Sequence, residues 1–150
     1  MNPIAFRQAM PSDRSMLERL LAAYRSACDR PPQPERIAGA LRAALAGDPF
    51  VRIWLVQQAG QTVGYVTVTL GFSIEAGGRD AFIDELFLEE PVRGRGIASQ
   101  VMRFAEAECR KLGVLCVHVE IAREDARARA AYQRLGFQDH QRSFLTKSLL

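Results

Sequence analysis

The chain has 150 residues, of which 48% are hydrophobic and 25% charged, and this composition excludes a largely disordered chain and predicts one globular domain over residues 1–150. The net charge of +3 suits an anionic small molecule but is too weak to indicate nucleic-acid binding, so no nucleic-acid partner is expected. No apolar signal segment and no run of membrane-spanning length is present, which predicts a soluble, cytoplasmic protein without a membrane partner.

The three cysteines, Cys28, Cys109 and Cys116, are odd in number and lack CxxC spacing. They therefore do not indicate a disulfide framework or a zinc site, and no metal is expected. His118 lies in a strand pattern and His140 in a polar stretch, and no spacing supports a nucleophilic pair of either histidine with a cysteine or an acid.

The first third of the chain predicts one short strand and two helices. Residues 4–6 form the strand, and Ser12 or Asp13 is expected to cap a helix whose apolar side chains recur at helical spacing from position 16 to position 24. Prolines between positions 31 and 34 interrupt this pattern. A second helix follows over residues 37–45 and ends near Gly47.

The period then changes to that of strands. Residues 50–56 and 63–70 are rich in branched and aromatic side chains and are joined by a polar segment with Gly60, which predicts an antiparallel hairpin. Further strands are predicted over residues 81–88, 114–121 and 144–150, with helices over residues 97–112 and 125–135. The resulting order, β-α-α-β-β-β-α-β-α-β, indicates a mixed α/β sheet rather than a doubly wound one.

A loop with two glycines joins the strand that ends at Leu88 to the next helix. The first turn of a helix has N–H groups without intrahelical partners, and these attract an anion at the positive end of the helix dipole. Gly94 and Gly96 have no side chain that would keep a phosphate away from the backbone, and Arg93 and Arg95 add positive charge. The loop therefore predicts a diphosphate site.

Other phosphate loops fit this segment less well. A dinucleotide fingerprint needs a third glycine where this chain has Ser99, and a P-loop needs Gly-Lys-Ser/Thr. An arginine-glycine tract that binds RNA would be repeated, whereas this one is single. The alternative that remains is a tight strand-to-helix turn without a ligand.

Two motifs together carry a family resemblance. Arg93, Gly96 and Ala98 form an R-x-x-G-x-A loop, and a Tyr-x-x-x-Gly-Phe element follows at residues 132–137. In both, the chain resembles the GNAT family of acyl-CoA N-acyltransferases, whose Q/R-x-x-G-x-G/A loop binds the pyrophosphate of coenzyme A. The resemblance is strong from residue 83 to residue 137 and looser upstream, where residues 7–13 look like a typical family opening.

The resemblance implies a single GNAT-like domain with a mixed, mostly antiparallel β-sheet, about four flanking helices and a splayed central pair of parallel strands. It also implies an acetyl-CoA-dependent N-acetyltransferase that moves an acetyl or small acyl group to an amine acceptor by direct attack in a ternary complex. The acceptor stays open between a polyamine, an antibiotic, an amino acid and a protein amine, and a homodimer is also left open. The alternative is a non-catalytic acyl-CoA-binding or protein-interaction module of the same fold.

The same resemblance assigns the coenzyme A site. The main chain of the strand end would bind the pantetheine arm, and an amide there, at Leu88, would stabilise the thioester oxyanion. The glycine loop would hold the diphosphate, and Asp125 stands where the family often has asparagine. The cofactor-binding residues are thus expected to be Leu86, Phe87, Leu88, Arg93, Gly94, Arg95, Gly96, Ile97, Ala98, Ser99 and Asp125.

Three residues are the candidates for proton transfer. Tyr132 matches the family position that protonates the leaving thiolate, although core packing in its helix is the simpler explanation from spacing alone. An amine is mostly protonated at neutral pH, so a base is needed. The resemblance implies Asp84 as the preferred base, acting directly or through water, with Glu85 as the second choice. Whether Asp84, Glu85 or water is the base stays open, and a solvated or salt-bridged acid without a role in proton transfer is the alternative.

Overall fold

The computed structural model describes residues 2–149, and five strands build its sheet. The chain forms two compact units, the first ending at Val119 and the second beginning at Glu120, and each is described by itself. The elements of the first unit are β1 (Ile4–Gln8), η1 (Pro11–Asp13), α1 (Arg14–Ala27), α2 (Pro34–Leu45), β2 (Val51–Gln58), β3 (Gln61–Ser73), β4 (Gly78–Leu88), η2 (Glu90–Val92), α3 (Ile97–Lys111) and β5 (Cys116–Val119). The second unit contains α4 (Ala126–Arg134).

The strands lie in sequence order, β1-β2-β3-β4-β5. Neighbours from β1 to β4 run antiparallel. Short turns join β2 to β3 and β3 to β4, whereas α1 and α2 lie between β1 and β2 in the chain. β4 and β5 run parallel, with α3 as the crossover. The predicted mixed, mostly antiparallel sheet with about four helices is therefore confirmed.

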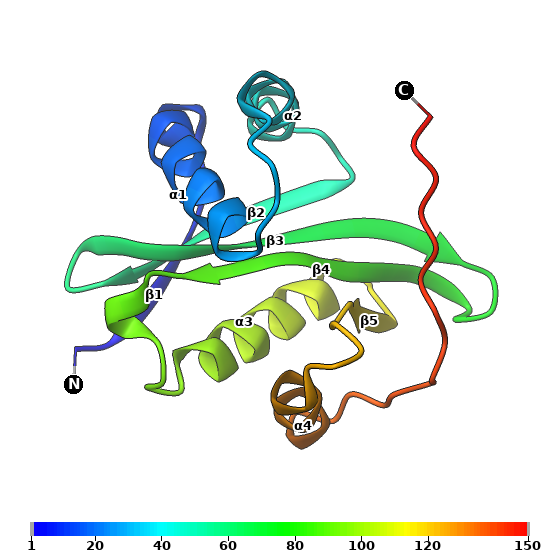
Figure 1. Cartoon of the computed structure of the whole chain (residues 1–150). Coiled ribbons are helices and arrows are strands. Elements are labelled where there is room, and N and C mark those ends of the chain that lie inside the picture. Colours follow the sequence, from blue (N-terminus) through cyan, green and yellow to red (C-terminus); the bar gives the residue numbers. More distant parts are fainter. Residues whose placement is uncertain (1, 150) are drawn as a thin grey trace. The chain divides into compact units, whose positions relative to one another are not determined.

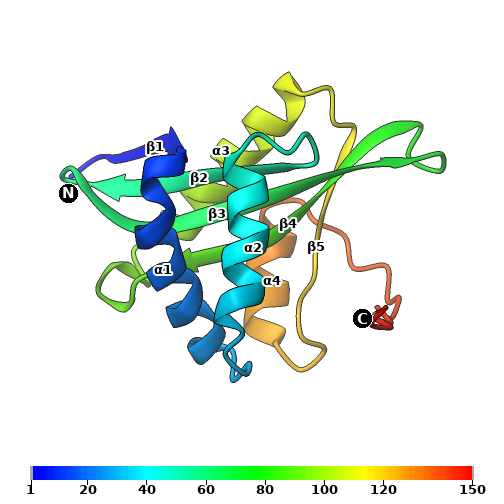
Figure 2. The same ribbon diagram turned by 90° about the horizontal axis from the view of Figure 1, so that it is seen from above.

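Helices cover both faces of this sheet (Figure 1). α1 and α2 lie side by side on one face, which Figure 2 shows from above, and α3 lies on the other. The first face buries Leu17 and Leu20 of α1 against Ile53, Leu55 and Tyr65 of the strands. Burial of such apolar side chains is the main stabilising term for both layers.

Aromatic side chains mark the packing of α3 on the opposite face. The ring of Phe104 stacks on Phe6 with centroids 4.1 Å apart and meets Trp54 edge-on at 5.6 Å. The stripe of α3 that includes Val101 and Ala105 is fully buried, because apolar residues recur every three or four positions along this helix. This packing fixes the helix whose first turn begins in the glycine loop.

One close backbone contact holds β3 against β4. Gly64 stands opposite Leu88, and a Cβ atom at position 64 would lie 2.2 Å from the Phe87 carbonyl oxygen. No side chain fits there, so glycine allows the end of β4 to approach β3.

Two local expectations are wrong. The predicted last strand over residues 144–150 does not form within residues 144–149, and residue 150 lies outside the described residues. A strand needs a ladder with a neighbour, and the sheet contains only β1 to β5 among the described residues, while Leu145 is 91% exposed.

The expected cap of the first helix also differs. Neither Ser12 nor Asp13 caps α1 with its side chain. The Asp13 carboxylate instead accepts hydrogen bonds from the Met10 amide at 2.7 Å and from the Arg7 guanidinium at 2.8 and 2.9 Å. These charge-assisted bonds lower the pKa of Asp13 and hold the end of β1 against the short η1 turn.

Candidate active site

The parallel pair of strands separates part of the way along the sheet. β4 pairs with β5 only from Asp80 to Ile83, opposite Cys116 to Val119, although β4 continues to Leu88. Beyond Ile83, β4 therefore pairs with β3 alone among the strands of the sheet, from Glu85 to Leu88. The predicted splay of the central parallel strands is confirmed.

Hydrogen-bond alternation shows which main-chain groups face the unpaired edge. The Glu89 amide donates to the Val63 carbonyl at 2.9 Å, so these residues form a hydrogen-bonded pair. In an antiparallel ladder such pairs alternate with non-hydrogen-bonded ones, which makes Leu86 and Leu88 non-hydrogen-bonded with respect to β3. Their N–H and C=O groups point to the edge that β5 has left.

Phe87 differs from the other two residues of this strand end. The same alternation turns its main chain toward Tyr65 in β3, so its amide belongs to the ladder. Of the three residues expected to bind a pantetheine arm, Leu86 and Leu88 have the required orientation and Phe87 does not. The sequence could not separate them, because the register of β3 against β4 decides which amides face outward.

The glycine loop enters α3 without a side-chain cap. Gly94 and Gly96 both have a φ of +73°, a conformation that other residues adopt only with strain, and Gly96 is the N-cap of α3. No side chain hydrogen-bonds to the cap, which leaves the first-turn amides of Ile97 to Ser99 without that common partner. A Cβ at either glycine would meet no atom within 4 Å, so the space beside both glycines is open.

Arg93 connects the loop to the end of β4. Its Nε donates to the Leu88 carbonyl at 2.7 Å, and its guanidinium lies 5.4 Å from the centre of the Phe87 ring. The Leu88 carbonyl must point away from β3 to accept this bond, which agrees with the alternation of the ladder. This hydrogen bond links the glycine loop to the unpaired end of β4. Arg95, in the same loop, is exposed.

The two adjacent acids of β4 have different surroundings. Thr67 pairs with Glu85 and Val68 with Ile83, so Asp84 is the extra residue of a β-bulge. Asp84 is exposed, whereas Glu85 is half-buried. The bulge therefore leaves Asp84 in solvent and turns Glu85 toward the face that α1 covers.

Glu85 has the environment of a base. Its Oε2 accepts a hydrogen bond from the Tyr65 hydroxyl at 3.0 Å. Burial raises the pKa of Glu85, and the Asp84 charge raises it further. The Tyr65 hydrogen bond and the charges of Arg30 and Arg25 oppose this rise. A carboxylate with a raised pKa accepts a proton more readily, which favours Glu85 over the preferred Asp84.

In the second unit, Tyr132 and Asp125 belong to the same short helix. The Asp125 carboxylate accepts a hydrogen bond from the Ala128 amide at 2.8 Å and so caps α4. The Tyr132 ring meets Phe137 edge-on at 5.5 Å. Burial and the Asp125 charge raise the pKa of Tyr132, which keeps its phenol protonated at neutral pH, as a proton donor must be.

One histidine cluster was not expected. His118 Nε2 lies 3.4 Å from Cys116 Sγ and 3.4 Å from an Asp80 carboxylate oxygen. Both contacts use the same ring nitrogen, so the acid does not orient the histidine through its other nitrogen as in a nucleophilic triad. The strand ladder brings these side chains together, since Asp80 is directly opposite Cys116.

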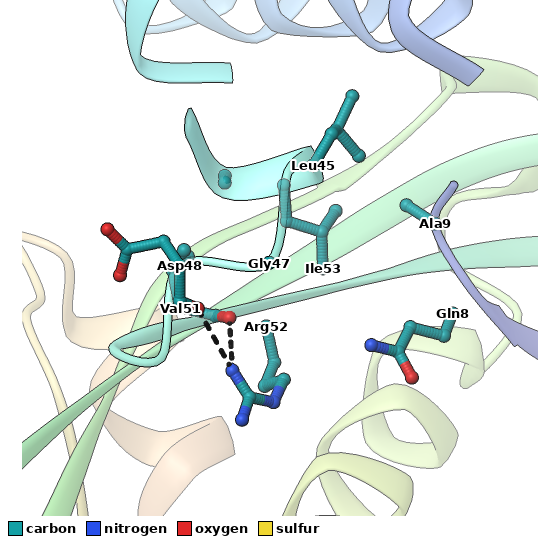
Figure 3. Close-up of a pocket in the computed structure, with 9 residues that line it drawn as sticks. Gln8, Ala9, Leu45, Gly47, Asp48, Val51, Arg52 and Ile53 are labelled. Carbon is teal, nitrogen blue, oxygen red and sulfur yellow. Dashed lines mark hydrogen bonds between the residues drawn. The ribbon is translucent and has the colours of Figure 1, made fainter. Parts of the chain in front are cut away.

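Two cavities lie in the first unit, and neither is lined by Glu85, Leu86, Leu88 or the glycine loop. One, of about 250 Å³, lies between β2 and the end of α2, and there Arg52 donates to the carbonyls of Asp48 and Val51 (Figure 3). The other, of about 600 Å³, lies between α1 and α2 and is lined by Arg14, Arg25 and Arg30 among others. No helix within residues 2–149 combines the length and the apolar character that a membrane span requires.

Comparison with known proteins identifies the family. The model of the acetyltransferase (GNAT) family matches residues 14–137. An aminoalkylphosphonate N-acetyltransferase from Salmonella typhimurium is 29% identical over 102 residues, which are 68% of this chain and 66% of that protein, slightly less than two thirds of its length.

Solved structures have the same fold. The integron cassette protein HFX_CASS3, from the mobile metagenome of Cole Harbour Salt Marsh, is 30% identical with a TM-score of 0.84 over 97% of this chain and 90% of its own. A predicted acetyltransferase from Clostridium acetobutylicum, solved with acetyl-CoA, is 17% identical with a TM-score of 0.80 over 97% and 96% of the two chains.

The chain belongs to the acetyltransferase (GNAT) family. The resemblance drawn from the glycine loop and the Tyr-x-x-x-Gly-Phe element is confirmed, and so is the fold that it implied.

The raised pKa of Glu85 predicts a pH-dependent stability. Glutamate in an unfolded chain has a pKa of about 4.3. The folded protein binds more protons than the unfolded chain between that value and the raised one, so the free energy of unfolding falls as pH rises through this window. Glu85→Gln removes this loss and still accepts the Tyr65 hydrogen bond. We expect equal stability at pH 4 and a higher free energy of unfolding than the wild type at pH 7, measured by urea denaturation.

Glu90→Gln is the matched control, because Glu90 is an exposed acid. It should change the free energy of unfolding by less than about 0.5 kcal/mol at either pH. The quantity to compare is the difference in free energy of unfolding between Glu85→Gln and the wild type. If this difference is no larger at pH 7 than at pH 4, the buried environment of Glu85 is contradicted.

Proposed function

We propose that this protein transfers an acetyl group from acetyl-CoA to the amino group of a small acceptor. The single observation that carries this proposal is the unpaired end of β4, where the amides of Leu86 and Leu88 stand next to the uncapped first turn of α3. Family membership supports it. We also propose that residues 1–150 act as one N-acetyltransferase domain, since the family match crosses from the first unit into the second.

The residues fit the acyl donor by their hydrogen-bonding groups. The open-edge main chain of Leu86 and Leu88 would bind the amide-rich pantetheine arm, since a strand edge recognises such groups. The amides of Gly94, Gly96, Ile97, Ala98 and Ser99 would hold the diphosphate, with Arg95 supplying charge. Arg93 would act mainly by holding this loop on β4. Asp125 could contribute one oxygen at most, because Oδ1 already caps α4.

Glu85 and Tyr132 would transfer the protons. Acetyl-CoA supplies an acetyl thioester, and the acceptor nitrogen bonds to its carbonyl carbon as the carbon–sulfur bond breaks. Glu85 would take one proton from the acceptor ammonium, and Tyr132 would give one to the departing sulfur. In total the ammonium loses two protons, of which one ends on sulfur and one in solvent, and Tyr132 is reprotonated. The Leu88 amide would stabilise charge on the thioester oxygen.

We further propose that the acceptor is a small amine that carries an anionic group. The charges of Arg30 and Arg25 act on Glu85, and they would attract an anion and repel a polycation. The Salmonella relative is named for aminoalkylphosphonates, which combine an amine with such a group.

The proposal is tested by acetyl-CoA turnover with aminomethylphosphonate, ethylamine and spermidine. The wild type should prefer aminomethylphosphonate, and Glu85→Gln should lower kcat/KM by about 100-fold or more, because loss of a general base commonly has this effect. Asp84→Asn, which changes the adjacent acid, should lower it by less than about threefold. A larger loss in Asp84→Asn would assign the base to Asp84, and a protein that neither binds nor turns over acetyl-CoA would refute the enzymatic function.

The glycine loop makes a second prediction. Gly96→Asp places negative charge in front of the first-turn amides and should raise the KM for acetyl-CoA by about tenfold or more, which corresponds to 1.4 kcal/mol. Gly113→Asp is the matched control, because Gly113 has a φ of +74° and equally open surroundings at the other end of α3. Equal KM values for the two variants, both folded by circular dichroism, would show that the loop does not bind the diphosphate.

Tyr132→Phe separates proton donation from binding. It removes only the hydroxyl, so the edge-on contact with Phe137 can persist. We expect kcat to fall by about 100-fold while the dissociation constant of coenzyme A, measured by calorimetry, changes by less than about threefold. Unchanged kcat would remove Tyr132 from the reaction.

A further inference from the structure

Thr67 carries a buried hydroxyl that no hydrogen bond satisfies. It lies in the middle of β3, is 8% exposed, and its Oγ1 is the buried side-chain polar atom without a hydrogen-bond partner among residues 2–149. Buried hydroxyls are nearly always paired, because leaving one unpaired costs free energy that a methyl group would not. An apolar side chain would serve β3 better if packing were its only task.

The position of Thr67 links it to the proposed base. The β3–β4 ladder sets Thr67 directly opposite Glu85. Side chains of directly opposed residues project from the same face of a sheet, with Cβ atoms about 5 Å apart. Thr67 is therefore the cross-strand neighbour of the carboxylate that takes a proton in the proposed reaction.

One oxygen of the Glu85 carboxylate accepts a hydrogen bond from a neighbouring side chain, and the other does not. The Tyr65 hydroxyl, which is two residues before Thr67 on the same face, donates to Oε2 of Glu85. Within residues 2–149, no side chain donates a hydrogen bond to Oε1 at 3.5 Å or less. A carboxylate oxygen without a side-chain donor and an unpaired hydroxyl thus belong to directly opposed residues on one face of the sheet.

We propose that Thr67 Oγ1 and the Glu85 carboxylate together bind the amino group of the acceptor. Both oxygens accept hydrogen bonds, and a primary amine or ammonium has the several N–H donors needed to meet both at once. Thr67 then positions the nitrogen while Glu85 takes its proton. This inference rests on the proposed function and adds the residue that fixes the acceptor.

The test compares three variants of β3 in steady-state turnover with aminomethylphosphonate and with ethylamine. Thr67→Val keeps the shape and removes the hydroxyl, so it should raise the KM for both amines about tenfold and leave the KM for acetyl-CoA within about twofold. Thr67→Ser retains a hydroxyl and should stay within about threefold of the wild type. Thr69→Val is the matched control, because Thr69 projects from the same face two residues further on but is only half-buried.

The melting temperature of Thr67→Val distinguishes a role in binding from a structural role, because the two predict changes in opposite directions. Since the hydroxyl has no partner in the fold, Thr67→Val should unfold at the same temperature as the wild type or higher. A lower melting temperature would indicate a structural hydrogen bond and overturn the inference.

The kinetic outcomes also separate this inference from the proposed function. Turnover with an unchanged amine KM in Thr67→Val would reject the role of Thr67 while the enzyme activity stands. Binding of acetyl-CoA by the wild type, without turnover or calorimetric binding of either amine, would reject the amine subsite. Absence of acetyl-CoA binding would reject the proposed function itself, and the subsite with it.

Discussion

The separation of β5 from β4 after the pair Ile83 and Val119 is the constraint on which the site depends. A sheet normally satisfies every main-chain amide of an inner strand, and unpaired ones are costly when buried. In this fold, β4 extends past its parallel neighbour, and the alternation of the β3 ladder turns the groups of Leu86 and Leu88 to the vacated edge. A ligand with its own amides can pair with that edge as a strand would.

The other parts of the first unit are arranged around this edge. Gly64 allows the end of β4 to lie against β3, and Arg93 holds the following loop on the Leu88 carbonyl. The loop places the uncapped start of α3 next to the strand end, and the buried stripe of α3 keeps the helix against the sheet. The strand amides proposed to bind the pantetheine arm and the helix amides proposed to bind the diphosphate therefore come from consecutive segments of the chain.

The bulge at Asp84 gives the two adjacent acids of β4 different surroundings. By exposing Asp84, it turns Glu85 to the helix-covered face, where burial raises the pKa of its carboxylate. The same register sets Thr67 opposite Glu85 and brings the Tyr65 hydroxyl to one of its oxygens. A carboxylate whose pKa is raised by burial and an unpaired buried hydroxyl both reduce stability, as groups retained for function commonly do.

The amino-acid sequence by itself determined the elements with strong periodicity, the glycine loop and the family. These are local properties: glycine permits φ values of +73° at positions 94 and 96, and a helix that follows such a loop has free amides wherever it packs. Only the tertiary structure decided that the main chain of Phe87 faces β3, that Glu85 is less exposed than Asp84, and that Thr67 lies opposite Glu85. All three depend on strand register and on one bulge, and a shift of one residue exchanges the faces of every side chain. The last predicted strand failed for the same reason, because an alternating segment becomes a strand only where a neighbouring ladder receives it.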